Sequence, residues 1–122
     1  MRTRQNAVDR ARRLRFHRLV DRVVMRLDPA LRKALDNVSI AVEDRPEDGS
    51  PDQFGVYEGI PKTERGQYTF AVPDRIVIYR IPLESAFPNQ AELEEQIRLT
   101  VLHEIGHHFG MDEFRLVDIG LG

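Results

Sequence analysis

An α+β fold in a single domain, residues 1–122, is the architecture that this sequence predicts. Two observations favour it: amphipathic helices flank a run of short strands, and the elements follow the order α-α-β-β-(β)-β-α. Hydrophobic residues make up 41% of the chain, which is within the usual range for globular domains. The length allows a core of two or three helices on a small sheet.

The first element is a helix over residues 6–27, preceded by a frayed end at 1–5. Apolar residues recur along it at helical spacing: Phe16, Leu19, Val20, Val23, Val24 and Leu27. The stripe predicts that Phe16, Val20 and Val23 face the core. Asp28 and Pro29 are typical of an N-cap followed by proline in the first turn, so a second short helix should extend to about Leu35.

The strands are predicted by alternation of apolar residues. Residues 38–42 alternate as a half-buried strand, and 43–53 form a polar loop. Phe54, Val56 and Ile60 indicate a second strand, which Gly55 and Gly59 weaken, so it belongs at a sheet edge. After a loop at 61–67, a strand at 68–72 would pair with the next one. The continuous apolar run 76–79 predicts the central strand.

A long helix ends the domain. After a loop at 82–88, Asn89 is the predicted N-cap. Apolar residues step by four along the helix: Leu93, Ile97, Val101 and Ile105. The helix should end at Gly110, a residue type that tolerates the left-handed conformation, and a short segment at 112–118 follows.

Composition excludes several classes of protein. The chain has no cysteine, which excludes disulfide frameworks, cysteine-based metal sites and a thiol nucleophile. No apolar run is long enough for a membrane span, and the Arg-rich start lacks the apolar core of a secretory signal. We therefore expect a cytoplasmic protein with no membrane partner.

Charge is distributed unevenly along the chain. Residues 1–36 hold 11 Lys and Arg against 4 Asp, whereas the remaining residues hold 7 against 16 Asp and Glu. Such asymmetry can indicate a nucleic-acid contact. The arginines lie on a helix with a good apolar stripe, however, so a solvated outer face is the favoured interpretation and a nucleic-acid partner is not expected.

Three of the four histidines cluster at residues 103–108, in the string His103-Glu104-Ile105-Gly106-His107-His108. On a helix, His103 and His107 lie one turn apart on the same side, so both imidazoles can bind one ion. Glu104 lies beside them, where it suits a general base rather than a ligand. Bound zinc lowers the pKa of a coordinated water towards about 7 and polarises a carbonyl, so the pattern is typical of a zinc hydrolase.

The stretches HEIGHHFGMDE, FGVYEGIPKTER and DRIVIYRIPLE resemble the small bacterial zincin-like metallopeptidases, or mini-zincins, over roughly residues 16–120. The resemblance implies a minimal zincin fold, with the active-site helix on a mixed sheet of three or four strands. It also implies a zinc peptidase with one Zn²⁺ per chain, ligands His103 and His107, and Glu104 as the catalytic acid and base. The family's third ligand is usually an aspartate three residues after the glycine, where this sequence has Glu113.

The third ligand is the least constrained part of the predicted metal site. A catalytic zinc site normally has three protein ligands, and only 15 residues follow His107. Gly110 can turn the chain back towards the metal. Glu113 then stands where the resembling family has its aspartate, so the resemblance implies Glu113 as the third ligand. Asp112 is the alternative and Asp118 a more distant one. Acids in the first turn of a terminal helix would explain Glu113 and Asp112 equally simply.

The remaining predictions concern substrate. A donor is needed to face the developing oxyanion, and Tyr57 on the edge strand is the first choice, ahead of Arg65, Tyr79 and His108. Packing of Tyr57 against the sheet is an equal alternative. A peptide or protein substrate would lie extended in an open groove along the edge strand. A catalytically inactive metal-binding or interaction module is the alternative function, because fold alone does not specify activity. The sequence does not determine the oligomeric state.

Overall fold

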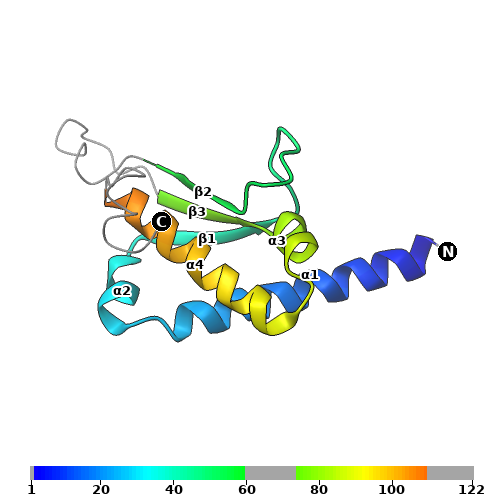
Figure 1. The fold of residues 1–122 in the computed structure, drawn as a ribbon, viewed down its shortest axis with the longest axis horizontal. Coiled ribbons are helices and arrows are strands. Elements are labelled where there is room, and N and C mark those ends of the chain that lie inside the picture. The colour runs from blue at the N-terminus through cyan, green and yellow to red at the C-terminus, as the bar shows by residue number, and fades with distance from the viewer. Residues whose placement is uncertain (1, 60–73, 110–122) are drawn as a thin grey trace.

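The computed structural model describes residues 2–59 and 74–109 (Figure 1). Two helices come first, three strands form the sheet, and two helices follow. Their bounds are α1 Arg2–Met25, α2 Pro29–Ala34, β1 Val38–Glu43, β2 Gly55–Glu58, β3 Asp74–Tyr79, α3 Arg80–Ala86 and α4 Gln90–His108. The α+β class is confirmed.

The sheet is mixed and has the order β1-β3-β2 in the described part of the chain. β1 runs parallel to β3, with Ile40 opposite Ile76, and β2 runs antiparallel to β3, with Tyr57 also opposite Ile76. Among the described strands β3 is therefore central, as the sequence predicts, and β2 lies at one side of the sheet. The predicted strand at 68–72 and Ile60 lie outside the described residues.

The core lies between the sheet, α1 and α4. α4 packs on β2 and β3, and α1 lies alongside α4 (Figure 1). The predicted inward stripe of α1 is buried, because Phe16, Val20 and Val23 are at most 3% exposed. The predicted stripe of α4 is buried too, and it consists of Leu93, Ile97, Val101 and Ile105. Asp28 and Asn89 cap α2 and α4 as predicted, each accepting a backbone N–H bond.

The predicted loop at 82–88 is wrong for its first part, because α3 occupies Arg80–Ala86 and follows β3 without a connecting residue. Pro82 falls in the first turn of α3, where the missing N–H has no helical partner to lose. Leu83 is fully buried, and Arg80 pairs with Glu84 one turn later. These tertiary and i,i+4 contacts favour a helix in a segment where proline suggested a loop.

α1 begins at Arg2, earlier than predicted, so residues 2–5 are helical. The N-terminal part of α1 extends beyond the rest of the domain (Figure 1). Arg12, Arg13 and His17 are exposed. Within residues 2–59 and 74–109, no helix combines the length and apolarity that crossing a bilayer requires.

Candidate metal centre

The C-terminal half of α4 holds the predicted metal-binding residues. His103 and His107 are half-buried and one turn apart, and the Glu104 side chain between them is buried, with the residue 6% exposed. α4 packs on β2 and β3 and contacts α1, so the helix has little freedom to move these groups. The helical register thus presents both imidazoles on one side from a rigid support.

The two imidazoles face each other closely. Their Nε2 atoms are 3.1 Å apart, and the ring centroids are 4.8 Å apart with the ring planes inclined by 75°. One ligand atom from each of His103, Glu104 and His107 lies within 4.8 Å of the other two. Two nitrogens bound to one tetrahedral zinc, each at 2.0–2.1 Å, are separated by roughly 3.3 Å. The arrangement of the two histidines therefore fits zinc.

A groove adjoins these residues. A cavity of about 370 Å³ is lined by His103 and Glu104 and by residues from two sides: Gln96, Leu99 and Thr100 of α4, and residues 52–55 leading into β2. At Gly55 the two sides approach closely, because an added Cβ would lie 2.7 Å from Thr100 Cγ2 and 3.0 Å from the Val77 carbonyl oxygen. The groove thus lies between the edge strand and the helix that carries the histidines.

The family model described as "Zincin-like metallopeptidase" matches residues 35–121, which is more than half of the chain. The chain belongs to the zincin-like metallopeptidase family. The small mixed sheet with α4 packed on it is consistent with a zincin-like fold, and the family implies zinc. No curated protein matches the sequence.

The match begins later than the resemblance at about residue 16 suggested, so α1 and α2 both precede the matched segment of this zincin-like metallopeptidase. α1 nevertheless supplies Phe16, Leu19, Val20 and Val23 to the core on which α4 packs. The helix with the metal-binding residues therefore depends on a partner element outside the matched segment.

Behind the metal-binding face of α4 lies a buried contact that the sequence did not predict. His108 Nδ1 is 2.7 Å from Asp74 Oδ2, and both side chains are 1% exposed. Asp74 is the first residue of β3, so the contact joins the last turn of α4 to the central strand. The His-His pair at 107–108 was visible in the sequence, but nothing local pointed to Asp74. His108 was a candidate oxyanion donor, and the structure places it in this buried contact.

Tyr57 lies beside the same contact. Its ring meets the His108 ring edge-on, with centroids 5.7 Å apart, and its hydroxyl oxygen is buried. Gly59, at φ +154°, has no room for a side chain, because a Cβ would overlap the Asp74 carboxylate and lie 3.0 Å from the Tyr57 hydroxyl. The oxyanion role of Tyr57 stays a prediction, and it requires this hydroxyl to become accessible to substrate.

The third-ligand candidates Glu113, Asp112 and Asp118 lie outside the described residues, as do Gly110 and Arg65. α4 ends at His108, with Phe109 as its C-cap, which is slightly before the predicted end at Gly110. Tyr79, the other oxyanion candidate, is buried at the end of β3.

Proposed function

We propose that this zincin-like metallopeptidase hydrolyses peptide or amide bonds with one zinc ion per chain. The observation that carries the proposal is the pair of Nε2 atoms 3.1 Å apart on one face of α4, with the Glu104 carboxylate in the same cluster. His103 and His107 would hold the metal. Zinc, when bound, supplies a Lewis acid that lowers the pKa of a coordinated water and polarises the scissile carbonyl.

Glu104 would do the proton transfer. Its carboxylate oxygen would accept the proton of the attacking water and pass that proton to the leaving nitrogen. The carboxylate is buried while bordering the groove, so few solvent molecules compete with substrate for it. This placement supports a base beside the metal, because the two imidazoles alone already fit the ligand spacing of zinc.

The groove suits an extended chain. β2 is an edge strand in the described part of the sheet, and the cavity that borders His103 runs between the start of β2 and α4. A peptide could bind by main-chain hydrogen bonds to this edge, while Leu99 and Phe54 offer apolar surface to its side chains. The proposed substrate is therefore a peptide or an exposed segment of a protein.

For the third ligand we propose Glu113, with Asp112 as the alternative. Zinc affinity measured separately for Glu113→Gln and Asp112→Asn distinguishes them. The Glu113 variant should bind zinc far more weakly and the Asp112 variant nearly normally. The reverse order would make Asp112 the third ligand. If neither substitution changes zinc affinity, neither acid is a ligand.

The deciding experiment is metal analysis of the purified chain together with cleavage of a broad peptide library. We expect about one zinc per chain and metal-dependent cleavage. His103→Ala and His107→Ala should each abolish zinc uptake, while the exposed His17→Ala is the matched control and should leave it unchanged. Full zinc occupancy in the double alanine variant would contradict the site. Zinc without turnover on any library would favour the alternative, a non-catalytic metal-binding module.

A further inference from the structure

A second cavity lies at the opposite end of α4 from the histidines. It has a volume of about 590 Å³ and is enclosed by α1, α3, the loop residue Arg45 and the start of α4. The charged residues that line it are Asp9, Arg12, Arg15, Arg45, Arg80 and Glu84. His103 lies thirteen positions after Gln90, which borders this cavity, so the two sites are roughly 20 Å apart along the helix axis.

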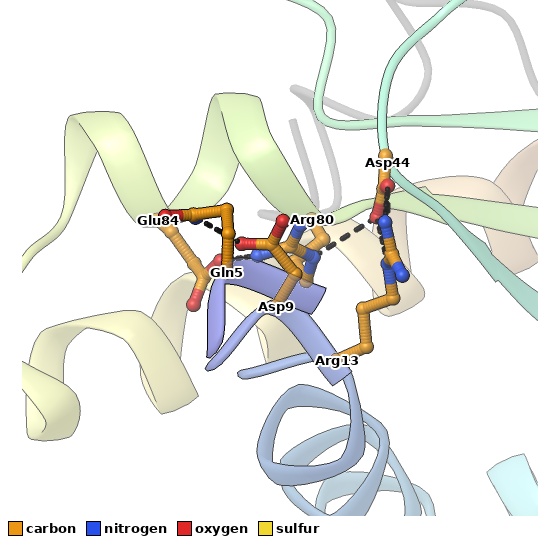
Figure 2. A network of polar contacts seen from close by, with 6 residues as sticks. All are labelled: Gln5, Asp9, Arg13, Asp44, Arg80 and Glu84. Atoms are coloured by element: carbon orange, nitrogen blue, oxygen red, sulfur yellow. Dashed lines mark hydrogen bonds and ion pairs between the residues drawn. The ribbon is translucent and has the colours of Figure 1, made fainter. Parts of the chain in front are cut away.

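The side of α1 that faces the core changes from apolar to charged residues where it reaches this cavity. At Phe16 and Leu19 the stripe is apolar and buried, but one and two turns earlier the same side carries Arg12 and Asp9. Asp9 accepts a hydrogen bond from Gln5 one turn before it (Figure 2). This side of α1 is therefore polar next to the cavity, although an apolar surface would be needed there for α1 to pack on the core.

Arg80 is the fixed part of the cavity wall. Its side chain is only 7% exposed, and its guanidinium donates through Nε to Asp44 at 3.0 Å and through Nη1 to Glu84 (Figure 2). Arg13 of α1 binds the same Asp44 carboxylate from the other side. Carboxylates from two segments of the chain therefore hold the Arg80 guanidinium in a fixed orientation at the border of the cavity.

The cavity carries excess positive charge. Asp44 and Glu84 neutralise Arg80 and Arg13, which leaves Arg12, Arg15 and Arg45 against Asp9. Across residues 2–59 and 74–109, no carboxylate lies within ion-pair distance of those three arginines. The local balance is thus two positive charges, contributed by two separate segments of the chain.

The rest of the lining is apolar. Phe16, Leu19 and Leu93 form a buried floor, and Phe87 and Pro88 stand at the side. The volume is within the range of sites for small molecules, which is about 300–1,000 Å³. Planar guanidinium groups match the oxygens of phosphate, and an apolar floor accommodates a carbon skeleton.

From these features we infer that the cavity binds a small molecule in which a doubly charged phosphomonoester is joined to an apolar group. Arg12, Arg15 and Arg45 would neutralise the phosphate, Arg80 would orient it, and the apolar part would rest on Phe16 and Leu93. The inference is independent of peptide hydrolysis at the zinc site.

The test is calorimetric titration of the zinc-loaded chain with phenyl phosphate, inorganic phosphate and phenol. Phenyl phosphate should bind saturably and more tightly than either comparator. It alone carries both a phosphate for the arginines and an apolar ring for the buried floor of the cavity. Arg12→Gln with Arg15→Gln should weaken it roughly tenfold or more, as expected for loss of charge-assisted hydrogen bonds. Arg45→Gln, from a different segment, should weaken it as well.

Two controls make the result decisive. Arg10→Gln with Arg18→Gln removes the same charge from exposed positions of α1 that do not line the cavity, and should change affinity less than about twofold. His103→Ala should leave phenyl phosphate binding intact. The inference is overturned if no saturable binding occurs below about 10 mM, if both arginine pairs weaken binding equally, or if His103→Ala abolishes it.

Discussion

The two ends of α4 meet the rest of the domain in opposite ways. At the C-terminal end, Asp74 and His108 are paired in full burial behind the residues proposed to bind metal. At the N-terminal end, exposed arginines from α1 and a loop surround a cavity in which Arg80 is the buried arginine. Burial makes the first end rigid and sensitive to substitution, whereas solvent screens the charges of the second. One helix thus carries the proposed metal site at one end and borders the proposed binding cavity at the other.

The largest effect expected from this comparison is on turnover at the buried end. Glu104→Gln should retain zinc and lower the cleavage rate by about 10²–10⁴-fold, because the amide cannot accept a proton. Glu95→Gln changes an exposed carboxylate on the same helix and should leave the rate unchanged. Single-turnover cleavage and metal content measured on both variants check this. Undiminished cleavage by Glu104→Gln would exclude it as the base.

The next largest expected effect is on the free energy of unfolding, through the packing of α1, which supports both ends of α4. Phe16 is 1% exposed, so Phe16→Ala should cost about 3–5 kcal/mol of unfolding free energy. Reversing charge at the exposed Arg12 and Arg13 should cost less than about 1 kcal/mol, because exposed pairs contribute little. Urea denaturation of the two variants gives both values. A silent Phe16→Ala with a large loss from the reversals would mean that α1 packs by its other face.

Loss of the Asp74–His108 contact should lower the free energy of unfolding by nearly as much as Phe16→Ala. Asp74→Ala removes one member of a fully buried pair and should cost about 3 kcal/mol of unfolding free energy. The exposed pair of Glu95 and Arg98 supplies the control, since Glu95→Ala should leave the urea midpoint in place. An Asp74→Ala variant as stable as the parent would show that the contact does not hold α4 to β3.

The smallest effect is a pH dependence at the other end. Partial burial raises the pKa of Asp44, but hydrogen bonds from Arg13 and Arg80 and their charges outweigh it and lower the pKa below its ordinary 3.8. Stability from Asp44 is therefore complete above the ordinary pKa and is lost as pH falls through the lowered value. Asp44→Asn should make the loss of stability below about pH 4 shallower, measured by thermal unfolding against pH. Identical slopes in parent and variant would contradict the assignment.

How much the sequence predicted depends on how local each feature is. The stripe through Leu93, Ile97 and Val101 and the spacing of His103 and His107 belong to single helices, so periodicity was sufficient. The buried run 76–79 likewise predicted the central strand. Glu113 remains a prediction because it lies outside the described residues.

Features that join distant segments were not predictable in this way. Asp74 meets His108 across 34 positions of sequence, and Arg80 meets Asp44 across 36. These pairs leave no periodic pattern in the sequence, because each involves only one residue from each segment. α3 was missed for a related reason: Leu83 packs into a core that sequence alone cannot locate.

The close approach at Gly55 sets the width of the groove. Because Gly55 has no side chain, β2 lies so close to α4 that a Cβ at this position would be 2.7 Å from Thr100 Cγ2. A methyl group at Gly55 would act as a wedge that pushes the strand outward. Residue 55 is therefore a position at which the range of accepted substrates could be retuned without touching a histidine.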